Sequence, residues 1–101
     1  MNKEFAGKVM IITGAAQGIG QRVAELAAAQ GARLALVDRS PLVQEVREQL
    51  SAITEVIAIE ADLEHFEGAE QAAERTHKAF GRIDILVNNV GGTIWTRPFE
   101  H

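Results

Sequence analysis

A glycine-rich turn between an apolar strand and a helix is the feature that most constrains the fold of this chain. Residues 13–20 read Thr-Gly-Ala-Ala-Gln-Gly-Ile-Gly, directly after the apolar run of residues 9–12. Gly14 can take backbone angles closed to other residues, Gly18 leaves backbone N–H groups open to an anion, and Gly20 lets the helix pack closely on the strand. The free N–H groups and the positive end of that helix point toward the turn. The pattern therefore predicts a site for the pyrophosphate of a dinucleotide.

A carboxylate at the end of the next apolar run supports this interpretation. Residues 34–37 lead into Asp38, at about the 20-residue separation expected of an acid that accepts a hydrogen bond from an adenosine ribose. The glycines alone also fit an ordinary strand-to-helix turn, because their spacing is Gly-x-x-x-Gly-x-Gly rather than Gly-x-Gly-x-x-Gly. Asp38 would repel a ribose 2′-phosphate, and the neighbouring Arg39 offsets only part of that repulsion. NAD is therefore the expected cofactor rather than NADP.

Composition and charge exclude several classes of function. The chain has 101 residues, enough for one small domain spanning 1–101, with a net charge of −4 and no basic cluster. Nucleic acid and membranes are therefore not expected as partners. There is no cysteine, and His65, His77 and His101 lack metal-ligand spacing, so no disulfide or metal site is expected. The start of the chain lacks an apolar signal core, which predicts a soluble, cytoplasmic protein.

Apolar runs alternate with helical patterns along the chain. Strands are predicted at residues 8–13, 33–38, 55–60 and 83–88. Helices are predicted at residues 18–30, from Ser40-Pro41 onward, and at residues 65–80. Gly31 and Gly81 are placed to end the first and the third of these helices. This order implies an α/β fold with a doubly wound parallel sheet, strand order 3-2-1-4, and a ligand site beyond the carboxyl ends of the strands. The residues expected to pack inward are Ile19, Val23, Leu26 and Ala27 in the first helix, Leu42, Val46 and Leu50 in the second, and Phe66, Ala69, Ala73, Thr76 and Phe80 in the third.

Motifs at three strand ends together resemble those of the short-chain dehydrogenase/reductase family. Besides the glycine turn, they are Asp62-Leu63 after the third strand and Asn-Asn-Val-Gly-Gly at residues 88–92 after the fourth. The resemblance covers essentially the whole chain and implies a Rossmann-type NAD-binding domain, of which residues 1–101 are the amino-terminal part. It also implies that Asp62 and Leu63 lie along the adenine, although Asp62 is equally suited to cap the following helix. Asn88 and Asn89 would bridge neighbouring strands and line the nicotinamide ribose.

The same resemblance assigns a set of cofactor-binding residues. Gln17 supports NAD, because relatives that use NADP often place a cation there. Val90 stands where the family usually has alanine. The expected cofactor-binding residues are Gly14, Gln17, Gly18, Ile19, Gly20, Asp38, Asp62, Leu63, Asn89 and Gly91.

Within the family, residues 88–101 look like those of the dehydrogenases that act on benzoate cis-diols. That likeness implies NAD-dependent oxidation of a dihydroxycyclohexadiene carboxylate to a catechol, with loss of carbon dioxide. Trp95 and Arg97 would suit an aromatic ring and a carboxylate, although packing of Trp95 on the sheet and solvation of Arg97 are at least as compatible with the sequence. A 3-oxoacyl-carrier-protein reductase, a generic alcohol dehydrogenase and a non-catalytic nucleotide-binding fragment are the alternatives.

The catalytic residues of the family have no counterpart in this sequence. The chain contains no tyrosine, so the residue that exchanges a proton with the substrate cannot be assigned, and no catalytic residue is predicted. We therefore expect the amino-terminal portion of a longer enzyme, with a small-molecule substrate and a homo-oligomeric full-length form. Without later strands, the fourth strand would be a bare apolar edge that favours self-association.

Overall fold

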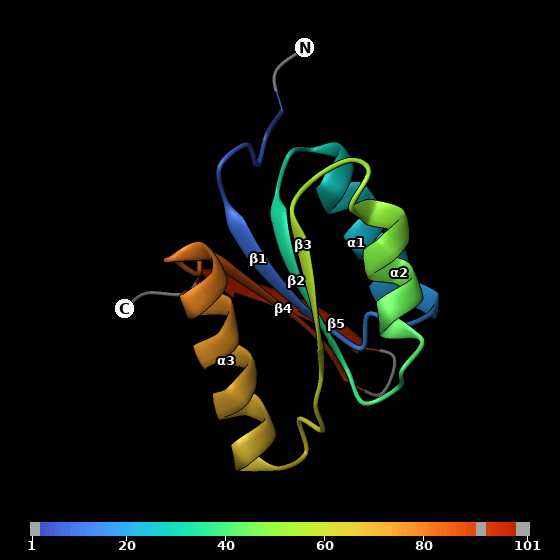
Figure 1. Cartoon of the computed structure of the whole chain (residues 1–101), viewed down its shortest axis with the longest axis vertical. Coiled ribbons are helices and arrows are strands. Elements are labelled where there is room, and N and C mark those ends of the chain that lie inside the picture. The colour runs from blue at the N-terminus through green and yellow to red at the C-terminus, as the bar shows by residue number, and fades with distance from the viewer. Residues whose placement is uncertain (1–2, 91–92, 99–101) are drawn as a thin grey trace.

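The computed structural model contains one five-stranded sheet in the order β3-β2-β1-β4-β5, with helices on both faces (Figure 1). It describes residues 3–90 and 93–98, and from residue 90 onward it describes the backbone alone. The elements are β1 (Val9–Thr13), α1 (Gly18–Ala29), β2 (Arg33–Asp38), α2 (Val43–Leu50), β3 (Val56–Glu60), α3 (Phe66–Phe80), β4 (Ile85–Val90) and β5 (Thr93–Pro98).

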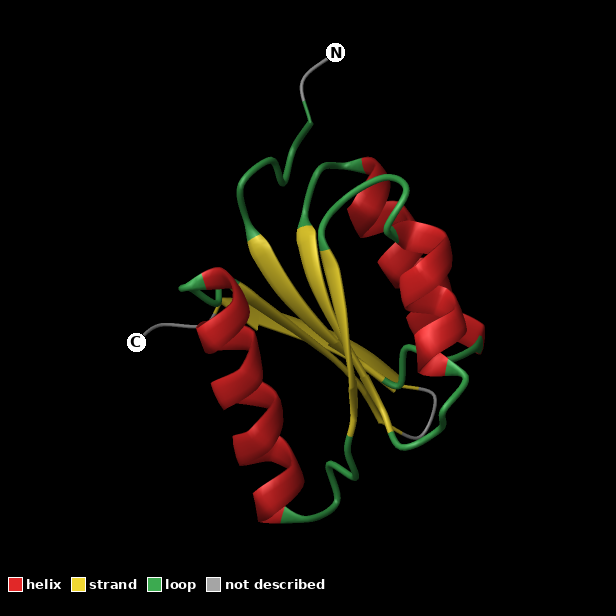
Figure 2. Ribbon diagram, viewed as in Figure 1, coloured by secondary structure: helices red, strands yellow, loops and turns green. Residues whose placement is uncertain are grey.

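The first four strands are parallel and follow the predicted order 3-2-1-4. In the centre of the sheet, Met10 of β1 lies opposite Leu34 of β2 on one side and Ile85 of β4 on the other. Every residue of β1 is buried, which explains why this strand is an unbroken apolar run rather than an alternating one. Helices α1 and α2 cover one face and α3 covers the other (Figure 2).

The expected bare edge at the fourth strand is wrong. β5 runs antiparallel to β4, with Val87 opposite Thr96 and Ile85 opposite Pro98. β4 therefore has a hydrogen-bonded neighbour on both sides, and the free edges of the described sheet are β3 and β5. The expectation of self-association through β4 loses its physical basis, because the backbone groups of that strand are already paired.

The packing face of α1 differs from the predicted one. Ile19 and Leu26, both expected to face inward, are 54% and 53% exposed. The other two predicted residues do face inward, since Ala27 is buried and Val23 is partly buried against the core. Ala24 and Ala28, which were not predicted, are buried as well. Small side chains allow the helix axis to approach the sheet closely, so a pattern based on large apolar residues identified only part of the buried face.

The other two helices show the same kind of difference. Leu42 is half exposed and precedes α2, in which Val43 is fully buried. Phe66, at the start of α3, is 75% exposed, and the buried residues of that helix are Ala72 and Thr76. The remaining predicted residues Val46 and Leu50 are buried, Ala73 and Phe80 are partly buried, and Ala69 is exposed.

Element boundaries agree with the predicted ones to within one residue except at the start of α2 and at both ends of β4. α2 begins at Val43 because residues 40–43 form a turn, in which the Ser40 hydroxyl accepts a hydrogen bond from the Leu42 N–H at 3.2 Å. β4 begins at Ile85 rather than at residue 83. Gly31 and Gly81 follow α1 and α3 with φ of +89° and +75°, which confirms their predicted role in ending these helices.

Asp84 joins the amino-terminal ends of β1 and β4. Its Oδ2 accepts a hydrogen bond from the Val9 N–H at 2.9 Å, and its Oδ1 accepts one from Arg82 at 2.7 Å. These contacts, the bond from Arg82 first, hold the pKa of Asp84 below its usual value despite partial desolvation. The central pair of strands is thereby tied together at the end opposite the carboxyl ends of the strands.

Candidate functional site

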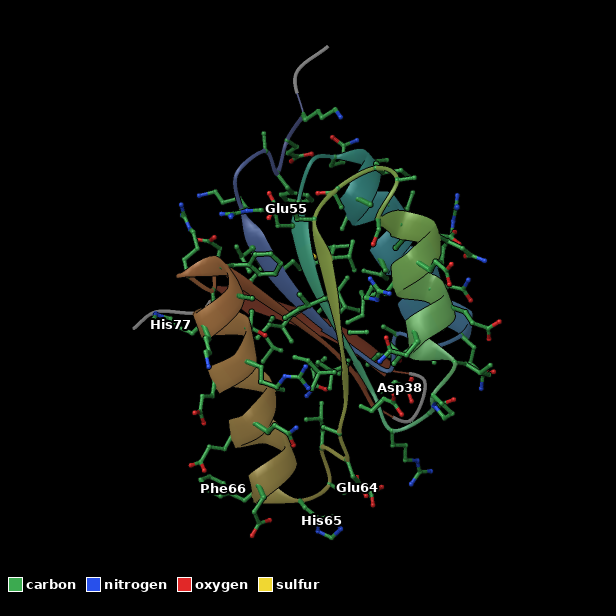
Figure 3. All side chains as sticks on the ribbon, viewed as in Figure 1. Asp38, Glu55, Glu64, His65, Phe66 and His77 are labelled. Atoms are coloured by element: carbon green, nitrogen blue, oxygen red, sulfur yellow. The ribbon has the colours of Figure 1, made fainter. Side chains whose placement is uncertain are left out.

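A cavity of about 640 Å³ opens at the carboxyl ends of the parallel strands, under α3. Figure 3 shows Asp38 and Glu64 toward this end of the sheet and Glu55 at the opposite end. The cavity brings together residues from all three predicted motifs, which are far apart in the sequence. The predicted residues that line it are Gly14, Asp38, Asp62, Leu63 and Asn89, together with Thr13, Arg39 and Asn88.

The three glycines of the turn are required for different reasons. Gly14 and Gly18 both have φ of +63°, a conformation that favours glycine. A Cβ on Gly14 would lie 2.9 Å from the Asn89 amide nitrogen, and a Cβ on Gly20 would overlap the Gly14 carbonyl oxygen. A Cβ on Gly18 would meet no atom within 4 Å. Gly14 and Gly20 therefore allow close packing, whereas Gly18 leaves open space beside the first turn of α1.

Asp38 is the last residue of β2, and both of its carboxylate oxygens accept backbone hydrogen bonds. Oδ2 accepts from the Ala16 N–H at 3.0 Å, and Oδ1 accepts from the Ser40 N–H at 2.9 Å. The sequence predicted an acid at this strand end, and a bond to the N–H two residues further on is common for aspartate, but the bond from Ala16 had no local signal. The carboxylate is consequently held in one orientation at the margin of the cavity.

Thr13 connects β1 to the two asparagines of β4. Its hydroxyl donates to Asn88 Oδ1 at 2.9 Å and accepts from the Asn89 N–H at 2.9 Å. The Asn89 amide nitrogen lies 3.5 Å from the Gly14 carbonyl oxygen, to which it donates. Asn88 and Asn89 thus bridge neighbouring segments as predicted. Sequence reasoning did not single out Thr13, although a threonine that ends an otherwise apolar strand was a usable signal.

Asn89 Oδ1 is buried and has no hydrogen-bond partner among the described residues. A buried acceptor of this kind costs free energy unless it finds a donor. Asn89 is one of the residues that line the cavity, so this unsatisfied acceptor belongs to the candidate site.

The loop after β3 supplies Asp62 and Leu63. Asp62 Oδ1 accepts from the Glu64 N–H at 3.0 Å, and Oδ2 lies 3.7 Å from His65 Nε2. The alternative role of Asp62 as the cap of α3 is wrong, because His65 holds the N-cap position and no side chain caps that helix. A Cβ on Gly68 would overlap the Asp62 carbonyl oxygen, so Gly68 lets α3 approach the loop. Sequence reasoning missed this glycine.

The remaining predicted residues either do not line the cavity or lie outside the residues that the structure describes. Four predicted residues of the turn, Gln17, Gly18, Ile19 and Gly20, do not line the cavity; the first three are exposed and Gly20 is buried. Gly91 lies outside the described residues, and the side chains of Trp95 and Arg97 do as well. Within residues 3–90, no group of histidines and carboxylates is arranged to hold a metal ion. No helix in the described part of the chain is long and apolar enough to span a membrane.

Curated relatives match the chain over nearly its whole length. It is 57% identical over 101 residues to a 1,6-dihydroxycyclohexa-2,4-diene-1-carboxylate dehydrogenase of Pseudomonas putida, covering 100% of this chain and 38% of that protein. The protein with the same name from Acinetobacter baylyi is 48% identical over 99 residues, covering 97% of this chain and 38% of that protein. The chain thus spans little more than a third of the length of these relatives.

Solved structures share the fold. A short-chain dehydrogenase/reductase from Burkholderia phymatum in complex with NAD matches 82% of this chain and 30% of its own, with a TM-score of 0.79 and 34% identity. The L-sorbose reductase of Gluconobacter frateurii, complexed with NADPH and L-sorbose, matches 90% of this chain and 36% of its own, with a TM-score of 0.84 and 36% identity. Residues 8–101 match the model of the short chain dehydrogenase family. The chain belongs to the short-chain dehydrogenase family of oxidoreductases.

Proposed function

We propose that the protein carrying this chain is an NAD-dependent dehydrogenase that oxidises a dihydroxycyclohexadiene carboxylate to a catechol with loss of carbon dioxide. The observation that carries the proposal is the cavity at the strand ends, where Gly14 of the glycine turn, Asp38 and Asn89 converge. The substrate class rests on the names of the relatives that are 57% and 48% identical. Residues 1–101 would supply the cofactor-binding part of that enzyme.

The residues present fit a nicotinamide dinucleotide. The open space beside Gly18 and the first turn of α1 suit a pyrophosphate, because the helix presents free N–H groups there. Asp38 would accept from the adenosine ribose, and Leu63 would form an apolar wall beside the adenine. The orphaned Asn89 Oδ1 is an acceptor for a hydroxyl or amide of the nicotinamide half. When bound, the nicotinamide supplies the hydride acceptor, and these residues position it.

The ribose site favours NAD over NADP on electrostatic grounds. Like unit charges about 4 Å apart repel by about 4 kcal/mol at an effective dielectric near 20, so a 2′-phosphate next to Asp38 would be strongly disfavoured. Arg39 also lines the cavity, but its side chain is exposed and screened by solvent, so it offsets only part of this repulsion.

The test is a steady-state comparison on the full-length protein. We expect NADH formation from a cis-diol carboxylate of cyclohexadiene, and a kcat/KM with NAD that exceeds the value with NADP by at least about 100-fold, since 1.4 kcal/mol corresponds to a factor of ten. A higher kcat/KM with NADP would contradict the cofactor assignment. Turnover of a 3-oxoacyl thioester or a simple secondary alcohol, without turnover of the diol, would contradict the substrate assignment.

A further inference from the structure

Asp38 is bonded to the segments that follow three different strands. Its Oδ2 accepts from Ala16 after β1, its Oδ1 accepts from Ser40 after β2, and its carbonyl oxygen accepts from the Ala61 N–H after β3 at 3.1 Å. A carboxylate can accept about four hydrogen bonds, so two of these acceptor positions stay available for ribose hydroxyls. The same side chain can therefore bind a ligand while it holds the protein backbone.

The glycine turn is held from both sides of β1. On the β2 side, the Ala15 N–H donates to the Val37 carbonyl oxygen at 3.3 Å and the Ala16 N–H donates to Asp38 at 3.0 Å. On the β4 side, the Gly14 carbonyl oxygen accepts from Asn89 at 3.5 Å. Ala15 and Ala16 are buried, so water does not readily replace these bonds. The bond to Asp38 is the one with a charged partner, and charge-assisted bonds are the stronger kind.

We infer that Asp38 is a positioning residue for the phosphate-binding turn, in addition to its role at the ribose. The inference rests on the proposed function for the identity of the ligand, whereas the contact itself joins two groups of the protein. Asp38 orients the Ala16 peptide and with it the entry to α1, so ribose recognition and phosphate recognition depend on one carboxylate. It follows that removing the charge of Asp38 relieves the repulsion of NADP but also loosens the pyrophosphate site.

Asparagine cannot reproduce both contacts of Asp38. Its side chain has one oxygen acceptor, whereas the two N–H groups of Ala16 and Ser40 each require one. Asparagine commonly accepts from the N–H two residues further along the chain, which here is that of Ser40. Its amide NH₂ group would then face the Ala16 N–H, placing donor against donor. The Asp38→Asn variant therefore removes both the charge and the bond to Ala16 with almost no change in side-chain shape.

The experiment compares Asp38→Asn with Glu60→Gln in the full-length protein. Glu60 is the register partner of Asp38 on β3, and its side chain bonds to Gln44 at 3.1 Å on the surface rather than to the turn. Both variants lose one negative charge at neighbouring strand ends.

The first measurement is hydrogen exchange at the Ala16 amide by NMR, without cofactor. The second is the Kd of NAD and of NADP by calorimetry. Asp38→Ala, which lacks both carboxylate oxygens, is the second test variant. Hydrogen exchange at the Ala35 amide, in the core of β2, is the control that reports on global unfolding.

In Asp38→Asn and Asp38→Ala we expect Ala16 exchange to accelerate at least about tenfold, the effect of losing one bond to a charged group, with Ala35 unchanged. The affinity for NAD should fall about tenfold or more, and the affinity for NADP should not rise above that of the wild type. Glu60→Gln should leave exchange and both affinities within about twofold of the wild type.

Unchanged Ala16 exchange in both Asp38 variants would overturn the inference, and so would tighter binding of NADP by them. Faster exchange without any loss of NAD affinity would also overturn it, because the contact would then not position the phosphate site. If wild-type protein binds no dinucleotide, the proposed function fails instead, whatever the exchange rates are.

Discussion

At the scale of single residues, the candidate site depends on backbone conformation as much as on side chains. Gly18 combines a φ of +63° with open space where a Cβ would stand. Gly7 has the same two properties, with a φ of +80°, but lies before β1 at the other end of the strand. Substitutions at the two glycines therefore separate two effects: strain of the backbone, which both would cause, and blocked ligand binding, which only the substitution at Gly18 would cause.

Gly18→Val should abolish most cofactor binding while the fold survives. Its branched side chain would fill the space assigned to the pyrophosphate, and we expect NAD affinity to fall about 100-fold or more, that is by roughly 3 kcal/mol. Gly7→Val is the matched control, because it imposes a comparable conformational cost of about 1–2 kcal/mol away from the cavity. Calorimetry and thermal unfolding measure both variants. Normal NAD binding by Gly18→Val would refute the phosphate assignment.

The hydrogen bonds of Asp84 lead us to expect that its contribution to the free energy of unfolding depends on pH. Its pKa is lower in the folded protein than in the unfolded chain, so its stabilising effect is present above the unfolded value and lost as the pH falls through the folded one. Asp84→Asn should lower the free energy of unfolding by about 1–3 kcal/mol at neutral pH. The difference from the wild type should begin to shrink below about pH 4, where the carboxyl of the unfolded chain becomes protonated, and should disappear as the pH falls through the lower pKa of the folded protein.

Denaturant unfolding at several pH values measures this effect. Glu55→Gln is the control, since Glu55 is an exposed carboxylate at the same end of the sheet. A deficit of Asp84→Asn that is the same at pH 3 and pH 7 would show that the charge of Asp84 does not support the β1–β4 contact.

At the scale of elements, helix position is governed by close contacts of small residues. α1 buries alanines and has Gly20 against the Gly14 carbonyl group, while α3 has Gly68 against the Asp62 carbonyl group. In both cases a glycine near the start of the helix allows a backbone-to-backbone approach. Of the helices, α3 lines the cavity at the strand ends, and it does so with the small side chains of Ala69, Ala72 and Ala73.

Gly68→Ala tests this arrangement in α3. Alanine favours a helix by about 1 kcal/mol over glycine, so propensity alone predicts a more stable protein. The added Cβ would instead overlap the Asp62 carbonyl oxygen, and overpacking of this kind costs about 1–3 kcal/mol. We expect a lower melting temperature and weaker NAD binding. Glu70→Ala, at an exposed position of the same helix, should leave both nearly unchanged, and a stabilised Gly68→Ala would contradict the tight contact.

At the scale of the whole molecule, the described residues provide the features of a cofactor site but no proton-transferring tyrosine. We therefore expect the 101-residue polypeptide alone to form no NADH with a cis-diol carboxylate, whereas the full-length protein does. The measurement is NADH production by both at equal concentration, with light scattering for their masses. Comparable turnover by the 101-residue polypeptide would show that the chemistry does not require a tyrosine.

Much of the molecule could be predicted from the sequence alone. The order of strands and helices, the strand order 3-2-1-4, the glycine turn and Asp38 at the end of β2 all followed from local patterns and from the right-handedness of crossovers. These features are predictable because each depends on residues that are close together in the chain, or on a chirality rule that holds for nearly all such folds.

Other features were decided only by the tertiary structure. Asp38 and Ala16 become partners because β1 and β2 end side by side, and Thr13 meets Asn88 and Asn89 because β1 also borders β4. The pairing of β5 with β4 was equally out of reach. The inner faces of the helices were predicted only in part, with Ala27, Val46, Leu50 and Thr76 buried as expected and Ile19, Leu26 and Phe66 exposed. The physical reason is that such contacts depend on distances between elements, which hydropathy and turn signals along a single chain do not encode.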